Sequence, residues 1–230
     1  MDARGLDVAA RYIAGVVEEE KKANPGGWRA VLCSAELVEK IPRGLGGERI
    51  DEAGLPRGLD ANGLDEAVRY IAGILEEERR ASPGGWSAVL CCADVTYIVG
   101  GISQGGGLSL YLMCRKALGS FADGSDASSL PFSASIGLST WLPKCSLIPA
   151  PGVADAAGPE RAARHPLFMA HGKYDDLVAY TWGKDCSHLL RDAGFTNLSF
   201  KSYPKLGHDM CREELEDMRA WLLEHAPPPA

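Results

Sequence analysis

The chain has 230 residues, of which 46% are hydrophobic and 24% charged, and its mean hydropathy is -0.10. This composition is typical of a folded globular protein and excludes collagen-like, fibrous and fully disordered chains. A formal net charge of -7 argues against sequence-independent nucleic-acid binding, which requires a basic surface. The seven cysteines lack metal-binding spacing, no secretory signal is recognised, and no apolar run reaches the roughly 20 residues that span a bilayer. We therefore expect a reducing, cytoplasmic setting.

A segment near the front of the chain occurs twice. Residues 5–33 recur at 63–91, and only eight of the 29 aligned positions differ. Apolar residues at helical spacing predict a helix in each copy, which a Pro-Gly-Gly then ends. Because a solenoid needs about three or more units, two copies indicate a duplicated segment. The stretch 35–62 is rich in Gly and Pro and is interpreted as a linker without regular structure.

From residue 94 onward, predicted strands alternate with predicted helices. The predicted strands are 95–100, 133–138, 167–170 and 198–203, the predicted helices are 106–118, 180–193 and 212–225, and 119–131 and 143–166 are long loops. Spacing predicts that Trp182, Cys186, Leu189 and Ala193 share one face of the second helix, and that Leu215, Met218 and Leu222 face inward on the third. This alternation predicts an α/β fold, a mostly parallel sheet flanked by helices.

The division of the chain follows from these patterns. We expect a duplicated helix segment plus linker at 1–61, packed poorly; an α/β domain at 62–226; and a Pro-rich tail at 227–230.

The pentapeptide Gly101-Ile102-Ser103-Gln104-Gly105 joins a predicted strand to a predicted helix. It fits the G-x-S-x-G pattern, in which a strained turn exposes a serine hydroxyl above the sheet and glycine neighbours make room for that turn. The N–H of Gln104, at the start of the helix, would then act as an oxyanion donor toward developing negative charge. Two alternatives remain open: a glycine-rich turn with an incidental serine, and a phosphate-binding turn, although no G-x-x-x-x-G-K-[ST] is present.

Two further polar segments follow predicted strands: HGKYD, which contains His171 and Asp175, and GH, which contains His208. The carboxyl ends of parallel strands are where open α/β sheets place functional groups. The order Ser103, Asp175, His208 is the order of nucleophile, acid and base in α/β-hydrolases. Either Asp175 or the adjacent Asp176 alone could instead cap the following helix, and His171 could be a base or a structural residue.

Several segments resemble the acyl-protein thioesterase and carboxylesterase family of α/β-hydrolases: GLDEAVRYIAGILEEE, GGISQGGGLSLYLMCR, GLSTWLP, FMAHGKYDDLV and SYPKLGHDMCREELEDMRAWL. The resemblance covers roughly the last two-thirds of the chain. It implies that Ser103 is the nucleophile, Asp175 the orienting acid and His208 the base. It further implies that Trp141 and Leu142 line an acyl pocket.

Part of the family pattern has no counterpart upstream of Ser103. The family begins with strands that carry an H-G-x-G-D-x loop, whose backbone N–H is the second oxyanion donor. We therefore expect a truncated α/β-hydrolase with weakened activity, because the loss of one oxyanion donor typically lowers turnover about 10²–10³-fold. The strand at 95–100 would also become an exposed apolar edge, unless Ala30–Cys33 or Ala88–Cys92 pairs with it.

The resemblance implies a serine hydrolase of esters or thioesters, with S-depalmitoylation, lysophospholipase or carboxylesterase activity. Its substrates would be acylated proteins, lysophospholipids or small esters. It implies no metal or organic cofactor, no nucleic-acid partner and only transient contact with a membrane surface. Two alternatives remain: an impaired or inactive relative that keeps an acyl-binding groove, and a nucleotide or phosphate binder.

Overall fold

The computed structural model describes residues 29–32, 49–50, 56–57, 69, 73, 97–121, 123–130, 132–142 and 157–225. Five strands form one parallel sheet in the order β1-β4-β5-β6-β7. They are β1 (Arg29–Leu32), β4 (Tyr97–Ile102), β5 (Ala134–Leu138), β6 (Leu167–Gly172) and β7 (Leu198–Tyr203). The helices are α5 (Gln104–Leu118), α6 (Gly158–Ala163), α7 (Tyr180–Asp192) and α8 (Arg212–His225).

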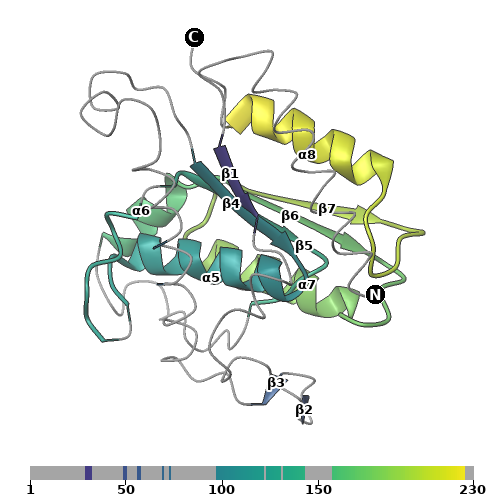
Figure 1. The fold of residues 1–230 in the computed structure, drawn as a ribbon, viewed down its shortest axis with the longest axis horizontal. Coiled ribbons are helices and arrows are strands. Elements are labelled where there is room, and N and C mark those ends of the chain that lie inside the picture. The colour runs from purple at the N-terminus through teal and green to yellow at the C-terminus, as the bar shows by residue number, and fades with distance from the viewer. Residues whose placement is uncertain are drawn as a thin grey trace.

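The helices cover both faces of the sheet. In Figure 1, α5, α6 and α7 lie against one face and α8 lies against the other. A parallel sheet with helices on both faces is the predicted α/β architecture, and this prediction is confirmed. Such a sheet places the carboxyl ends of all its strands at one edge, which is where ligands bind in open α/β folds.

Alternate strand residues supply two hydrophobic cores. On β6, Leu167 and Met169 belong to the core beneath α5 and α7, whereas Phe168 and Ala170 belong to the core beneath α8. This period of two is the geometry of a strand buried on both faces. The third helix packs as predicted, with Met218 and Leu222 buried.

Several predicted boundaries and one predicted face are wrong. The strand predicted to end at residue 100 continues to Ile102, and β6 continues to Gly172. The predicted loop at 143–166 contains the helix α6. On α7, Leu189 is exposed, and the buried residues are Gly183, Cys186, Ser187 and Leu190. Small residues on this face allow α7 to lie close to β6.

The front of the chain contributes a strand to the sheet. β1 pairs in parallel with β4, with Arg29 opposite Tyr97 and Leu32 opposite Gly100. Of the two segments that the sequence offered as a partner for this strand, the earlier one, at 30–33, supplies most of β1. The strand β4 is therefore an interior strand and not an exposed edge. The predicted linker also contains regular structure, because β2 (Arg49–Ile50) and β3 (Pro56–Arg57) form an antiparallel ribbon.

The two predicted helix copies lie largely outside the described residues. Arg69 and Gly73, the described residues of the second copy, are helical.

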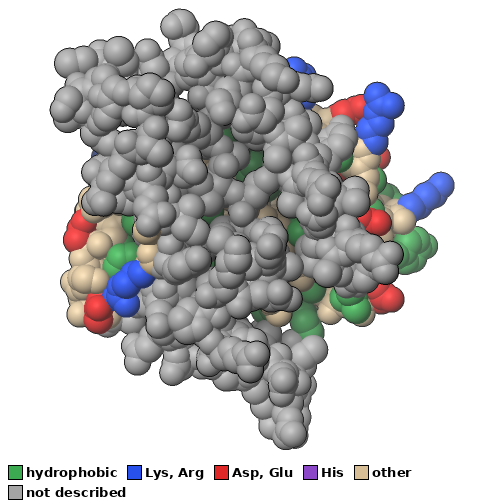
Figure 2. Space-filling view, in the orientation of Figure 1, with side chains coloured by type: hydrophobic (Ala, Val, Ile, Leu, Met, Phe, Trp, Pro, Cys, Tyr) green, Lys and Arg blue, Asp and Glu red, His purple; other side chains and the backbone are tan. Residues whose placement is uncertain are grey.

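In Figure 2 the charged side chains of the described residues are visible at the left and right margins of the face, and both signs occur at each margin. Two of the ion pairs join side chains along or onto α8: Arg212 with Glu216 at 2.7 Å and Lys201 with Asp217 at 3.4 Å. Exposed pairs of this kind contribute little to stability. None of the helices in the described ranges combines the length and apolar character that crossing a membrane requires.

Candidate active site

Ser103 lies in a strained turn between β4 and α5. Its backbone φ is 57° and its ψ is -125°, a conformation that non-glycine residues rarely adopt. The turn is fixed from both sides, because the Ser103 N–H donates to the carbonyl of Leu138 at 2.9 Å and its carbonyl accepts from the Thr140 hydroxyl at 2.5 Å. Strain of this kind, about 1–3 kcal/mol, persists only where the surroundings hold it and concentrates at functional sites.

Two glycines allow the elements around this turn to approach closely. A Cβ at Gly106 would lie 2.8 Å from the carbonyl oxygen of Gly101, and one at Gly137 would lie 2.9 Å from Cγ2 of Thr140. Any larger residue would push α5 or β5 away from the turn. The glycines therefore hold Thr140 within reach of the Ser103 carbonyl.

Asp175 and His208 meet where β6 and β7 end. Nδ1 of His208 lies 2.8 Å from Oδ2 of Asp175, and both side chains are buried. The loops that carry them are joined by the backbone, since the Tyr174 N–H donates to the carbonyl of Leu206 at 3.0 Å. A Cβ at Gly172 would lie 2.2 Å from that same carbonyl oxygen, so glycine is required for the loops to meet.

Four hydrogen-bond donors surround the Asp175 carboxylate. Oδ1 accepts from the N–H groups of Leu177 at 3.0 Å and Val178 at 2.8 Å. Oδ2 faces His208 Nδ1 at 2.8 Å and His171 Nε2 at 3.3 Å. Burial alone would raise the pKa of Asp175, but the hydrogen bonds from His171, His208 and Val178 outweigh burial and hold that pKa well below its usual range. Asp175 is thus an ionised, immobile acceptor for His208.

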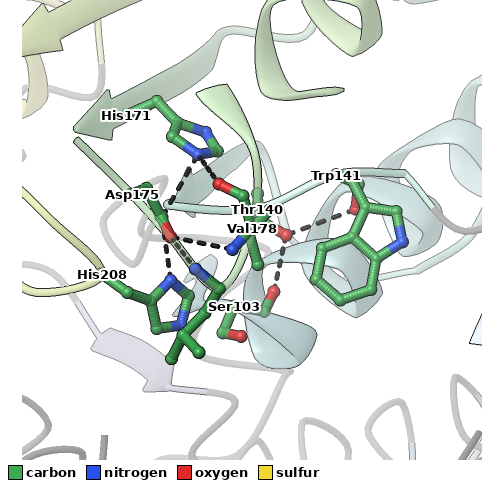
Figure 3. A network of polar contacts seen from close by, with 8 residues as sticks. Ser103, Thr140, Trp141, His171, Asp175, Val178 and His208 are labelled. Carbon is green, nitrogen blue, oxygen red and sulfur yellow. Dashed lines mark hydrogen bonds and ion pairs between the residues drawn. The ribbon is translucent and has the colours of Figure 1, made fainter. Parts of the chain in front are cut away.

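Figure 3 shows the two histidines converging on Asp175, with Ser103 drawn beside His208 in this view. Within the described part of the chain, no hydrogen bond joins the Ser103 hydroxyl to the His208 ring. Such contacts are often long before substrate binds. The structure thus joins Asp175 to His208 directly and places Ser103 at the carboxyl end of β4, on the same edge of the sheet.

The other candidate residues lie near this turn. Gln104 is the first residue of α5, where backbone N–H groups are free of helical partners. Trp141 and Leu142 are buried, and Trp141 meets Trp182 of α7 edge-on at 6.3 Å between ring centroids. Thr140 is a contact that the motif analysis missed, although it follows a predicted strand and the same strand-end rule applies to it.

A family comparison covers the part of the chain that contains this site. The model of the phospholipase/carboxylesterase family matches residues 56–226. The chain belongs to this family. The match includes the strained serine turn, the Asp175–His208 pair and the whole sheet apart from β1. The predicted family resemblance and α/β-hydrolase fold are confirmed.

The alignments with individual relatives cover only part of each relative's length. The chain is 29% identical to acyl-protein thioesterase 1 of Gibberella zeae over 187 residues, which is 80% of this chain and 66% of that protein. It is 29% identical to carboxylesterase SOBER1 of Arabidopsis thaliana, covering 71% of this chain and 60% of that protein. The crystal structure of Zea mays acyl-protein thioesterase 2 matches with a TM-score of 0.62 at 31% identity, covering 72% and 66% of the two chains. The chain thus spans about two-thirds or less of these relatives.

Proposed function

We propose that this family member is a serine hydrolase that cleaves carboxylic esters or thioesters. The observation that carries the proposal is the 2.8 Å contact between Asp175 and His208 at the sheet edge where the strained Ser103 turn also lies. A buried carboxylate bonded to Nδ1 of a histidine keeps Nε2 free to accept a proton. The positive φ of Ser103 is the strain that a nucleophile presented above a sheet requires.

In the first half of the reaction, the Ser103 oxygen attacks the carbonyl carbon of the substrate while His208 Nε2 takes the hydroxyl proton. Asp175 fixes the tautomer of His208 and stabilises the imidazolium. The tetrahedral intermediate then collapses, the bond to the alcohol or thiol breaks, and the leaving group receives the proton from His208. The product is an acyl ester of Ser103.

In the second half, His208 removes a proton from water, whose oxygen attacks the acyl carbonyl. The carboxylic acid leaves and the proton returns to the Ser103 oxygen. In this proposal the N–H of Gln104, the first residue of α5, donates to the oxyanion in both halves. A site that has this donor alone is expected to turn over about 10²–10³-fold more slowly than a site with two donors.

The names of the relatives suggest the substrates. Acyl-protein thioesterase and carboxylesterase relatives point to acylated proteins and small esters, and a lysophospholipase-like relative from Mus musculus points to lysophospholipids. All three share an acyl group on a hydrolysable oxygen or sulfur. The buried Trp141 and Leu142 next to the serine turn are the apolar side chains proposed to contact that acyl group.

A fluorophosphonate probe tests the nucleophile. The wild-type chain should be labelled and Ser103→Ala should not, because the probe phosphonylates an activated serine. Ser128→Ala is the matched control, since Ser128 lies in an exposed loop where its hydroxyl donates to Asp126 at 2.6 Å, and this variant should label normally. Thermal melting of each variant separates loss of reactivity from loss of folding.

The failure of labelling in a folded wild-type chain would refute the proposal. It would favour the inactive relative that binds an acyl chain without cleaving it. With labelling established, p-nitrophenyl esters of increasing chain length, an S-palmitoyl peptide and a lysophospholipid rank the substrate classes.

A further inference from the structure

We propose that His171 is a positioning residue for this reaction, which holds the Asp175 carboxylate in place as an uncharged hydrogen-bond donor. The inference rests on the proposed function, since it concerns the acid of the same site. His171 stands at the end of β6, four residues before Asp175, and its ring is 1% exposed.

The contacts of His171 identify which ring nitrogen carries hydrogen. Nε2 lies 2.9 Å from the carbonyl oxygen of Val178 and 3.3 Å from Oδ2 of Asp175. Both neighbours accept hydrogen bonds and neither can donate one, because Asp175 is ionised. Nε2 therefore carries the hydrogen and shares it between the carbonyl and the carboxylate.

The other ring nitrogen of His171, Nδ1, faces α7, where the backbone leaves no room for a hydrogen-bond partner. A Cβ built on Gly183 would lie 2.2 Å from Nδ1 of His171, so the ring packs directly on the glycine backbone. Tyr180 meets the ring edge-on at 5.9 Å between centroids. Among the described residues the hydrogen bond and the ion-pair contact of the ring are made by Nε2, so a second ring hydrogen on Nδ1 would gain no further protein acceptor. The geometry thus favours the singly protonated, uncharged ring.

An uncharged donor is what the site needs at this position. A cationic His171 would neutralise Asp175 and weaken its attraction for the imidazolium that forms on His208. A neutral ring instead restrains the carboxylate while leaving its charge available. His208 and His171 meet the same oxygen, Oδ2, so removing His171 changes the acceptor that His208 uses.

Two substitutions of His171 with side chains of similar length distinguish the loss of its hydrogen bond to Asp175 from the loss of its packing. His171→Gln keeps an N–H near the position of Nε2, whereas His171→Met fills a similar volume without a donor. We expect His171→Met to lower kcat/KM about tenfold or more, and His171→Gln to stay within about threefold of wild type. Loss of the donor makes the Asp175 carboxylate a better proton acceptor, so the acid limb of kcat/KM against pH should move to higher pH in His171→Met alone.

Gly183→Ala perturbs the same ring from the opposite side. The added methyl displaces the imidazole and should reproduce the loss of activity. In a His171→Ala background the methyl meets no ring, and its remaining close neighbour is the Thr140 carbonyl oxygen at 3.1 Å, so the same substitution should lower kcat/KM by a much smaller factor than it does in the wild-type chain. A full, additive loss in that background would overturn the inference. This cycle also keeps the test valid if His171→Met folds poorly.

A measurement without turnover separates this inference from the proposed function. The proton between His208 Nδ1 and Asp175 gives a downfield ¹H resonance, which should shift or broaden in His171→Met and persist in His171→Gln. An unchanged resonance, or wild-type kcat/KM and pH profile in His171→Met, overturns the role of His171 while Ser103→Ala remains inactive. Absence of labelling in the folded wild-type chain would overturn the proposed function, and the resonance would still decide the role of His171.

Discussion

Glu214 offers a quantitative test of burial in this fold. It is the third residue of α8 and is fully buried, and among the described residues no side chain donates a hydrogen bond to its carboxylate. Burial, with a contribution from the charge of Asp209, raises the pKa of Glu214 from 4.5 to about 8. The side chain is therefore protonated in the folded chain at neutral pH and ionised in the unfolded chain.

The sign and size of the effect follow from this difference. Because the folded state binds the proton more tightly, the free energy of unfolding falls as pH rises between 4.5 and 8. Each pH unit inside this window costs about 1.4 kcal/mol, which gives about 2.5 kcal/mol between pH 5 and 7. Glu214→Gln keeps the shape of the protonated acid and removes the ionisation, so its advantage over wild type should grow by that amount.

Urea unfolding at pH 5, 6 and 7 measures this growth. The fluorescence of Trp221, buried on the same helix, can report unfolding. Glu213→Gln is the matched control, because Glu213 is the exposed neighbour in the same turn and its removal should leave the pH dependence of wild type unchanged. If the difference between Glu214→Gln and wild type is constant over this pH range, the carboxyl is not held neutral and the reasoning fails.

Three further outcomes are expected. Asp175→Asn should lower kcat/KM about 10³–10⁴-fold, since the amide stabilises the wrong tautomer of His208, and it should also lower the melting temperature, because the donors around Asp175 lose a charged acceptor. Gly172→Ala should strongly reduce the extent of probe labelling and cause a smaller relative loss in the free energy of unfolding. The added Cβ would lie 2.2 Å from the Leu206 carbonyl oxygen and displace the His208 loop. Phe168→Ala should lower the free energy of unfolding in urea by about 3–5 kcal/mol, since the ring is fully buried.

The sequence predicted the central part of the fold well because that part is strongly patterned. Strand 198–203 and helix 212–225 agree with the structure residue for residue, and the other strands from β4 onward differ at one end or both by a few positions. Ser103 directly follows β4, and Asp175 and His208 lie in the loops that follow β6 and β7, so the strand-end rule could select them. The positive φ of Ser103 is also what its glycine neighbours indicate.

The remaining features depend on contacts between distant segments. α6 lies in a stretch rich in Pro, Ala and Gly, and its Arg161 donates to the carbonyls of Ala117 at 2.7 Å and Leu118 at 3.0 Å. These carbonyls end α5, so a tertiary contact stabilises a helix that local propensity does not favour. The sequence left open whether His171 is a base or a structural residue, because the role proposed for it depends on Val178 and Gly183, which the sequence does not place next to it.

The choice between the two copies of the duplicated segment was open from pattern alone, since both contain the same Ala-Val-Leu-Cys tetrapeptide. The number of residues between each copy and β4 decides which copy can pair in parallel with β4. A parallel neighbour requires a crossover of about a dozen residues or more, and only five residues separate Cys91 from Tyr97. The first copy has 64 residues between Leu32 and Tyr97, which is ample for a crossover. The parallel β1–β4 pairing therefore requires the earlier copy, and the duplication supplies the strand that covers the serine-bearing strand of the sheet.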